Sequence, residues 1–206
     1  TTLLLKQLLE KTLGAKVGLI GTMENMVGQE RIPTERTTPE SFELQGLFAQ
    51  MRDAGCQYAI MEVSSHALDL SRVYGLNYEV GAFTNLTQDH LDFHVTMDNY
   101  LLAKKKLFSQ SRVAVMNSDD DYFSQMSEGL KTELVTYSTK NSCCDFVAKN
   151  IKLRSDGTEF EIVYKNETYA IKTAIGGKFT PYNALCAIAC STLLWFDIET
   201  VIKSIA

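Results

Sequence analysis

Residues whose side chains could do chemistry gather in residues 84–108, "TNLTQDHLDFHVTMDNYLLAKKKLF". This stretch holds two of the three histidines of the chain, with three aspartates and three consecutive lysines. Imidazole and carboxylate groups ligate metals, so Asp89, His90, Asp92 and His94 predict either a metal site or a hydrogen-bonded turn. Zinc held by the histidines and an aspartate would indicate a hydrolase, whereas Mg²⁺ would need mostly carboxylate oxygens. The residue types by themselves leave both metals open.

The helix expected after this cluster carries a lysine on its apolar face. Met97, Tyr100 and Leu101 follow the i, i+3, i+4 spacing of one helix face, and Lys104 takes the i+7 place. The two lysines that follow fall off this stripe. An unpaired buried ammonium is very costly, so the side chain on the stripe must reach solvent, find an acid, lose its charge or be modified.

A second set of polar residues follows a predicted buried strand. The apolar run 58–63 includes Glu62 near its end and leads into Ser64, Ser65 and His66. In open parallel sheets ligands bind beyond the carboxyl ends of the strands, so Glu62 is a candidate Mg²⁺ ligand beside a nucleotide site. An acid that only meets solvent at a strand end explains the same position. We expect a local structural role for His66.

These candidates depend on a sheet that brings strand ends together. Apolar runs at 58–63, 80–86 and 112–117, separated by helical segments, indicate a parallel sheet covered on both faces. The fold class predicted is therefore α/β with a doubly wound, mostly parallel sheet. Beyond these strands the pattern changes to period-two alternation with Asp-Gly and Lys-Asn turn signals, which predicts a small antiparallel β meander over 145–177.

The remaining elements are helices, one strand and one long loop. We expect helices over 1–14, 41–55, 181–195 and 198–205, a strand within 16–22 and a loop over 23–39. Connections this long are uncommon unless they are functional or disordered, so "PTERTTPE" (33–40) is a candidate binding loop. The chain opens inside a helix and ends in one without a closing tail, and we expect it to be truncated at both ends.

Composition limits the classes of function. The chain has 206 residues, of which 45% are hydrophobic, and a formal charge of −5, which suits one α/β domain or two small ones. Nothing suggests a nucleic-acid or membrane-surface binder, and without an apolar run of about 18 residues we expect a cytoplasmic protein. The five cysteines lack CxxC spacing, so we expect neither a disulfide framework nor a zinc knuckle, and Cys56, Cys186 and Cys190 should be buried free thiols.

The motifs in order resemble one known family. "MEVSSHALDLSRVYGLNYEVGAFTNLTQDHLDFHVTMDNYLLAKKKLF" (61–108) closely resembles the central ATP-binding domain of the Mur ligases, and looks most like the MurE type. "TTLLLKQLLE" looks like the helix after the family's phosphate loop, "PTERTTP" like its substrate loop, "NSDDD" like its Asn-Ala-Asp-Asp turn and "GKFTPYNALCAIA" like its helix start. The resemblance covers 1–206 and implies a P-loop NTPase-like fold.

The resemblance implies roles for residues around a metal and a nucleotide. Lys104 stands where these ligases have a lysine carbamylated by CO₂, which helps to hold Mg²⁺, and Glu62 and His90 match the other metal ligands. Thr1 and Thr2 match threonines that follow the phosphate-loop lysine. The phosphate loop itself is not in this chain, so we expect ATP binding by the isolated chain to be severely weakened.

Further matches concern the substrate and the adenine of ATP. Thr37 and Thr38 match a pair that contacts UDP-muramoyl-dipeptide, and Ser64 and Arg72 match further contacts to it. Asn183 matches the asparagine near the adenine. The chain departs from the usual family pattern at Thr180, where an asparagine is frequent, and near Leu70, where a glutamine is frequent.

The activity implied is that of an ATP-dependent acid–amino-acid ligase of peptidoglycan synthesis. It adds the third residue to UDP-N-acetylmuramoyl-L-alanyl-D-glutamate through an acyl phosphate, with meso-diaminopimelate or L-lysine as the incoming amino acid. The N-terminal UDP-binding and C-terminal amino-acid-binding domains are outside this chain, so we expect the fragment to be inactive alone. Another Mur or folylpolyglutamate-type ligase is the nearest alternative, and a metal-dependent hydrolase is a distant one.

Overall fold

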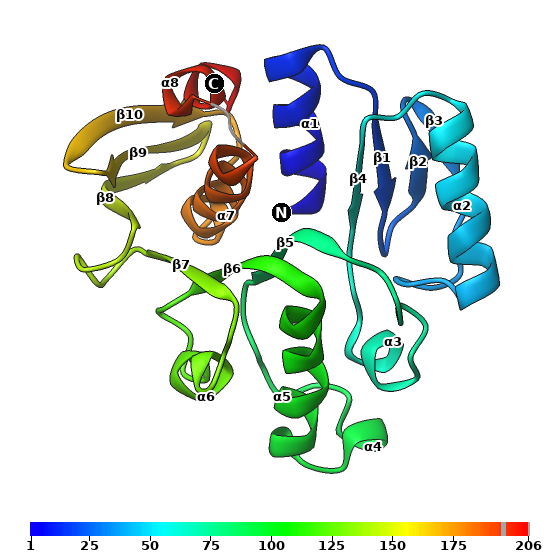
Figure 1. The fold of residues 1–206 in the computed structure, drawn as a ribbon. Helices are drawn as coiled ribbons and strands as arrows, with labels where there is room; N and C mark the ends of the chain where they lie inside the picture. The colour runs from blue at the N-terminus through cyan, green and yellow to red at the C-terminus, as the bar shows by residue number, and fades with distance from the viewer. Residues whose placement is uncertain (195–196, 206) are drawn as a thin grey trace. The chain divides into compact units, whose positions relative to one another are not determined.

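A computed structural model describes residues 1–194 and 197–205, which form two compact units. The N-terminal unit consists of Thr2–Asn77 and Gln88–Gln110, and the C-terminal unit consists of Thr1, Tyr78–Thr87 and the described residues from Ser111 onward. The ribbon can be followed through both units in Figure 1. The polar cluster after residue 88 thus belongs to the same unit as Glu62.

The N-terminal unit is built on a four-stranded sheet. Its strand order is β3-β2-β1-β4, with β1 at Val17–Ile20, β2 at Asn25–Val27, β3 at Glu30–Ile32 and β4 at Tyr58–Met61. The two longer strands, β1 and β4, pair in parallel, and the other two pairings are antiparallel. Helix α1 (Thr2–Leu13) packs against β1 and β4. All four residues of β1 are buried, as expected for a strand covered on both faces.

The hairpin of β2 and β3 corrects the expected loop over 23–39. Its turn contains Gly28, whose φ of 63° lies in the left-handed region that glycine adopts without strain. Strands of three residues are too short to show alternation, which is why the sequence pattern read as a loop. Residues 33–40 have no regular structure, so this part of the expected loop is confirmed as a loop, and its role in binding stays a prediction.

Helix α2 (Ser41–Asp53) lies on the opposite side of this sheet from α1 in Figure 1. It buries Leu44, Leu47 and Met51 in the core of the N-terminal unit. A Cβ atom added to Gly18 would lie 2.2 Å from the sulfur of Met51, so the glycine in β1 leaves the space that the Met51 side chain of this helix fills.

Four short helical segments complete the N-terminal unit. They are α3 (Ser65–Asp69), α4 (Leu91–His94), α5 (Met97–Lys105) and the 3₁₀ helix η1 (Lys106–Gln110). Helix α3 packs against α5 and η1. The helix predicted from the stripe of Met97, Tyr100, Leu101 and Lys104 is α5, and the chain after Lys105 tightens to 3₁₀ geometry, as is common at helix ends. Phe108 is nevertheless buried.

The C-terminal unit contains a six-stranded sheet of order β10-β9-β8-β7-β6-β5. The strands are β5 (Tyr78–Phe83), β6 (Ser111–Asn117), β7 (Glu133–Ser138), β8 (Phe146–Arg154), β9 (Gly157–Tyr164) and β10 (Glu167–Thr173). The pairs from β5 to β8 are parallel, and β8, β9 and β10 are joined antiparallel within residues 145–177. The strands predicted at 58–63, 80–86 and 112–117 are thus divided between two sheets, because apolar periodicity identifies strands but not their partners.

Helix α7 (Thr180–Leu193) packs against five strands of this sheet, and α8 (Ile198–Ile205) packs against α7 and β10. Cys186 and Cys190 are buried free thiols on α7, as predicted, whereas Cys56 in the N-terminal unit is half-buried. The helix predicted over 181–195 corresponds to α7, and its expected end at Trp195 falls outside the described residues. A short helix, α6 (Phe123–Ser127), follows β6.

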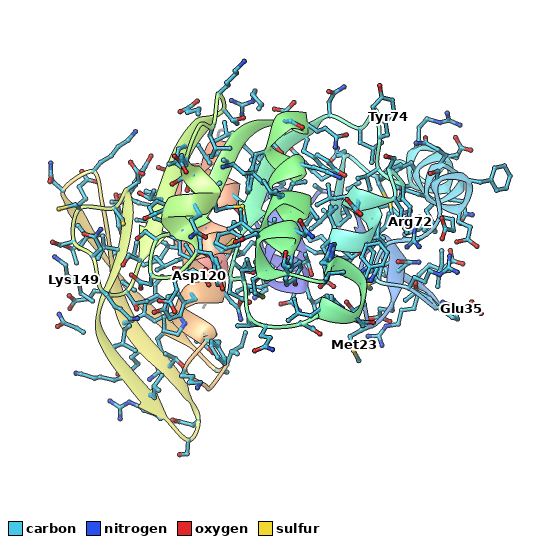
Figure 2. All side chains as sticks on the ribbon, turned by 90° about the horizontal axis from the view of Figure 1, so that it is seen from below. Met23, Glu35, Arg72, Tyr74, Asp120 and Lys149 are labelled. Carbon is cyan, nitrogen blue, oxygen red and sulfur yellow. The ribbon has the colours of Figure 1, made fainter. Side chains whose placement is uncertain are left out.

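Large apolar side chains are also exposed. Met23 and Tyr74, labelled in Figure 2, belong to the N-terminal unit, as does Phe42. Across residues 1–194 and 197–205, every helix is too short or too polar to traverse a lipid bilayer.

Candidate functional site

Glu62 lies directly after β4 and is surrounded by hydroxyl groups. Thr2 Oγ1 donates to Glu62 Oε1 at 2.9 Å, and Thr22, which follows β1, donates to Oε2 from its backbone N–H at 3.0 Å and its hydroxyl at 2.6 Å. Burial alone would raise the pKa of Glu62, but the hydrogen bonds from Thr22 and Thr2 together lower it. Glu62 is therefore a carboxylate at neutral pH, held at the carboxyl ends of two parallel strands.

Gly21 and Thr37 lie close to this group of residues. A Cβ atom added to Gly21 would lie 3.4 Å from Glu62 Cδ. Thr37 Oγ1 lies 3.1 Å from Thr22 Oγ1. Because the single hydroxyl proton of Thr22 goes to Glu62, Thr37 is the donor in this pair. Thr37, in the candidate binding loop, is thus linked to the carboxylate of Glu62 through the hydroxyl of Thr22.

Thr38 and Ser64 hold the backbone around the strand end. Thr38 is buried, and its hydroxyl donates to the carbonyl of Glu62 at 2.8 Å while it accepts from the N–H of Ser64 at 2.9 Å. Ser64 Oγ in turn accepts from the N–H of Ala67 at 3.2 Å and caps α3. These two hydroxyls therefore position the loop and the start of α3.

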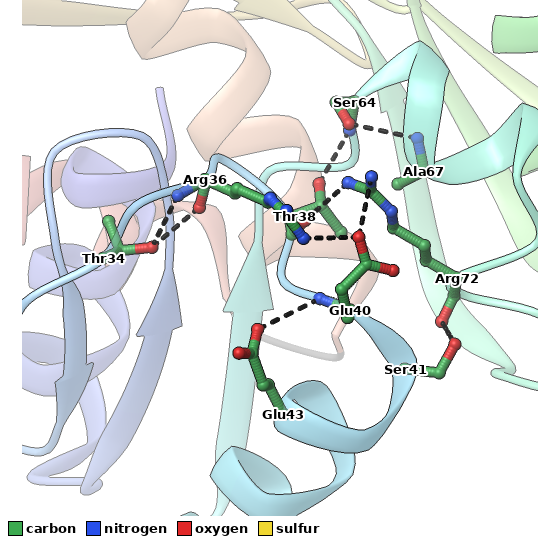
Figure 3. A network of polar contacts seen from close by, with 9 residues as sticks. All are labelled: Thr34, Arg36, Thr38, Glu40, Ser41, Glu43, Ser64, Ala67 and Arg72. Carbon is green, nitrogen blue, oxygen red and sulfur yellow. Dashed lines mark hydrogen bonds and ion pairs between the residues drawn. The ribbon is translucent and has the colours of Figure 1, made fainter.

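Arg72 is the centre of the polar network in Figure 3. Its Nη2 lies 2.9 Å from Glu40 Oε1, and its Nη1 donates to the carbonyl of Thr38 at 3.3 Å. Glu40 Oε1 also pairs with Arg36, and Ser41 Oγ donates to the backbone carbonyl of Arg72 at 3.1 Å. Glu40 and Thr38 of the loop thus hold the guanidinium of Arg72, while Ser41 at the start of α2 holds its backbone.

One donor of Arg72 is left over. Its Nε is buried and makes no hydrogen bond within the described parts of the chain. A buried N–H without an acceptor is costly, and a planar guanidinium suits the oxygens of a carboxylate or phosphate. The side chain is only 15% exposed, and Glu40 and Thr38 hold its guanidinium.

His90 and Lys104 both lie against the ring of Tyr100. The His90 ring meets it edge-on, with centroids 5.9 Å apart, and Lys104 Nζ lies 5.3 Å from its centroid. Tyr100 is buried, whereas Lys104 is half-buried and His90 is exposed. Burial raises the pKa of the Tyr100 hydroxyl, so the ring is neutral at physiological pH. Lys104, which lies on the predicted apolar stripe, and His90 therefore both contact the ring of Tyr100.

Of the two readings of Asp89, His90, Asp92 and His94, the structure favours the hydrogen-bonded turn over a metal site made by these four residues. Among the described residues, no group of three or more His, Cys, Asp or Glu side chains is arranged to hold a metal ion. Asp89 caps the backbone N–H of His90 at 2.8 Å, Asp92 is exposed, and His94 is buried against Ser65. Asp92 and His94 lie in the single turn of α4, His90 is its N-cap and Asp89 precedes the cap, so their side chains point in different directions. This arrangement gives no support to the zinc hydrolase.

Three residues near these side chains were not singled out from the sequence as functional. Thr22 follows a predicted strand, so the strand-end rule applied to Glu62 could have found it. Glu40 precedes Glu43 by three residues, the spacing of a capping box, and its N–H donates to Glu43 Oε2 at 3.3 Å. Tyr100 lay on the predicted stripe but was assigned only to the core.

In the C-terminal unit, Thr1 Oγ1 donates to Asn183 Oδ1 at 2.6 Å. The same unit holds a half-buried acid, Asp119. Asp119 accepts from Ser138 Oγ, from the N–H of Thr139 at 2.8 Å and from the hydroxyl of Tyr182 at 3.0 Å. Because Tyr182 precedes Asn183 in α7, these bonds tie the ends of β6 and β7 to the helix that carries the predicted adenine-side residue.

Burial alone would raise the pKa of Asp119, but the hydrogen bonds from Ser138, Thr139 and Tyr182 lower it. A depressed folded-state pKa adds stability above the unfolded value, and this stability is lost as pH falls through the folded value. Asp119→Asn should therefore cost about 2 kcal/mol of unfolding free energy at neutral pH, and the deficit should shrink below about pH 4. Urea unfolding of Asp119→Asn and the wild type at neutral pH and below about pH 4 tests this prediction, with the exposed Asp121→Asn as control. A loss of unfolding free energy that does not change with pH would contradict the prediction.

Comparison with known proteins gives one consistent result. Residues 1–191 match the Mur ligase middle domain. The UDP-N-acetylmuramoyl-L-alanyl-D-glutamate–2,6-diaminopimelate ligase of Clostridium botulinum is 44% identical over 201 residues, 98% of this chain and 41% of that protein. The ligase of the same name from Caldanaerobacter subterraneus subsp. tengcongensis is 42% identical over 206 residues, 100% of this chain and 42% of that protein.

Comparison with solved structures gives the same result as comparison with sequences. A UDP-N-acetylmuramoyl-L-alanyl-D-glutamate–2,6-diaminopimelate ligase superposes with a TM-score of 0.86 at 25% identity, covering 99% of this chain and 43% of that chain. A MurF structure from Acinetobacter baumannii has a TM-score of 0.73 at 17% identity, over 100% of this chain and 43% of that chain, a likeness of fold alone. The chain thus spans about two fifths of the length of the curated relatives it matches.

Proposed function

This chain belongs to the Mur ligase family, and on that premise we propose that the protein containing it is an ATP-dependent ligase of the MurE type. The reaction proposed is addition of an amino acid to the D-glutamate carboxylate of UDP-N-acetylmuramoyl-L-alanyl-D-glutamate. The observation that carries the proposal is 44% identity over 98% of the chain to a ligase of that name. Such an enzyme would serve peptidoglycan synthesis, and through it cell-wall growth, cell shape and division.

The incoming amino acid proposed is meso-diaminopimelate. The relatives from Clostridium botulinum and Caldanaerobacter subterraneus both carry 2,6-diaminopimelate in their names, which favours it over L-lysine. A folylpolyglutamate-type ligase shares the fold, since a structure described as an FPGS–AMPPCP complex has a TM-score of 0.71, but its identity of 15% carries no further argument.

The chemistry proposed is activation followed by amide formation. The γ-phosphoryl group of ATP passes to the D-glutamate carboxylate, and the amine of the incoming amino acid attacks the resulting acyl phosphate with release of phosphate. Mg²⁺ bound at such a site neutralises charge on the phosphates. The protein's own contribution is to position donor and acceptor and to supply fixed charges and hydrogen-bond donors.

Glu62, His90 and Lys104 would hold the metal. Because its pKa is lowered, Glu62 is ionised and can supply an oxygen ligand, and the hydroxyls of Thr2 and Thr22 orient its carboxylate. Mg²⁺ prefers several oxygen ligands, whereas an ammonium at Lys104 would repel it. We therefore propose that Lys104 is carbamylated, which replaces a cation by an anion with two oxygens. This modification also explains a lysine half-buried beside Tyr100.

Arg72 would bind an anionic group of the UDP-muramoyl-dipeptide. Its unpartnered Nε and its placement by Glu40 and Thr38 support this role. Thr37 and Ser64 lie on the loop and helix start beside it and are proposed substrate contacts. Thr1, Thr2 and Asn183 are proposed to face ATP.

An assay of the complete protein tests the proposal. Incubation with ATP, Mg²⁺, UDP-N-acetylmuramoyl-L-alanyl-D-glutamate and meso-diaminopimelate should release one phosphate per tripeptide product, detected by mass spectrometry. Omission of ATP should stop the reaction, and L-lysine should be a poorer substrate. Turnover without ATP, or none with any amino acid, would contradict the proposed function.

A further inference from the structure

His94 is a buried polar residue for which the proposed reaction has no task. Its side chain is 4% exposed, and its Nε2 lies 2.8 Å from Ser65 Oγ, which is itself 2% exposed. Burial lowers the pKa of His94, so the ring is neutral at physiological pH, and its Nε2 shares one hydrogen bond with the serine hydroxyl, as donor or acceptor according to the tautomer. Ser65 is the first residue of α3 and follows Ser64.

The ring of His94 also stacks on Tyr100. Their centroids are 5.1 Å apart and the ring planes are inclined by only 16°. Tyr100 is the residue that both His90 and Lys104 touch. His94 thus lies between the start of α3 and the ring that supports two of the proposed metal ligands.

The backbone around His94 needs such an anchor. The four-residue helix α4 has His90 at φ 55° before it and Val95 at φ 68° after it, both in the left-handed region. Residues other than glycine adopt this region at a cost, which is greatest for a β-branched side chain, and persist there only where the surroundings enforce it. The strained position of His90 is therefore maintained by its surroundings, which include the ring of His66 at 4.9 Å between centroids and the hydrogen bonds of the turn.

The hydrogen bonds of the turn converge on His94. Its N–H donates to the carbonyl of His90 at 2.9 Å, and its own carbonyl accepts from the N–H of Thr96 at 2.8 Å and from Asn99 Nδ2 at 2.9 Å. Each end of the strained turn is thereby tied to one residue, whose side chain is fixed by Ser65 and Tyr100.

We propose that His94 is a positioning residue: its bond to Ser65 and its stack on Tyr100 hold His90 and Lys104 in the geometry that a divalent cation needs. The inference rests on the proposed function, because it assigns His94 to the support of that metal site. Partners that orient metal ligands in this way commonly change metal affinity when removed.

The test is a double-variant cycle in the complete enzyme. Ser65→Ala removes the hydrogen bond, and His94→Phe removes it while it keeps a ring for the stack on Tyr100. Each should raise the Mg²⁺ concentration for half-maximal activity at least about tenfold. The double variant should show no further increase, because both changes remove one interaction. The KM for meso-diaminopimelate should stay within about twofold in all three.

A second readout does not depend on turnover. Protein equilibrated with ¹³C-bicarbonate should show a lysine carbamate signal by NMR in the wild type, none in Lys104→Ala, and a weaker one in Ser65→Ala and His94→Phe. Leu102→Ala, an exposed position on α5, is the matched control and should match the wild type in both measurements.

Thermal unfolding separates positioning from a structural role. Each single variant leaves one buried polar group unpaired, whereas the double variant leaves none, so its stability should recover toward that of the wild type while its Mg²⁺ requirement stays raised. The role of His94 would be overturned if the Mg²⁺ requirement of the double variant recovered in parallel with its stability. It would also be overturned if both single variants kept the wild-type Mg²⁺ requirement and an intact carbamate signal. A wild type without the carbamate signal would instead contradict the proposed site chemistry on which the inference rests.

Discussion

Lys104→Ala in the complete enzyme is expected to lower the ligation rate by about a thousandfold, the scale at which a fixed catalytic charge is lost. The structure supports this because Lys104 Nζ lies 5.3 Å from the centroid of the Tyr100 ring, which the ring of His90 also meets. Alanine removes the atom that would carry the carbamate and leaves a small gap over the ring of Tyr100. Steady-state kinetics at saturating substrates measure the loss.

Formate or acetate should restore part of the activity of Lys104→Ala. A short carboxylate can enter the gap and supply the two oxygens that the carbamate would provide. The matched control is Lys106→Ala two residues on, which breaks a surface pair with Asp69 at 2.6 Å and should change the rate by less than about threefold. Wild-type activity in Lys104→Ala without any added carboxylate would refute the carbamate.

Arg72→Ala should raise the KM for the UDP-muramoyl-dipeptide by about a hundredfold, as expected when a buried, hydrogen-bonded charge loses its ionic partner. The KM for ATP should remain near the wild-type value, because the network of Arg72 is confined to the loop 33–40 and the segment after β4. Arg72→Lys should recover little, since an ammonium cannot reproduce the planar fork that Thr38 and Glu40 hold.

Glu40→Gln is the informative control for Arg72. It removes the internal anion but leaves Arg72 Nη1 bound to the carbonyl of Thr38, and the glutamine oxygen can still accept from Nη2. The KM for the dipeptide substrate should then change by only a few fold. Equal KM values for the dipeptide in wild type and Arg72→Ala would exclude Arg72 as a substrate contact.

Much of the local structure was predictable. Helices over 1–14, 41–55 and 198–205 and the strands at 58–63 and 112–117 agree with the elements found within a few residues, because their apolar positions repeat with a clear period. The matches to the Mur ligase middle domain and to a solved ligase structure confirm the family and the fold class. The β2–β3 hairpin and β7 were missed, since short strands give little periodic signal.

The candidate site was predictable in part. Glu62 and Thr22 follow from the rule that ligands lie beyond the carboxyl ends of parallel strands. The partner of Arg72 did not follow, because Glu40 and Arg72 are distant in sequence and their pairing depends on how the loop before α2 meets the segment after α3. No local pattern encodes such a contact.

The amino-acid sequence by itself determined which family this chain belongs to and which residue types are available, because motif order and spacing are properties of the covalent chain. Only the tertiary structure decided which members of the cluster at 89–94 face one another. His90 and His94 are four residues apart, yet the left-handed backbone at His90 and Val95 leaves one imidazole exposed and buries the other against Ser65. Side-chain direction there depends on backbone dihedrals and packing from other helices, which no periodicity in the sequence records.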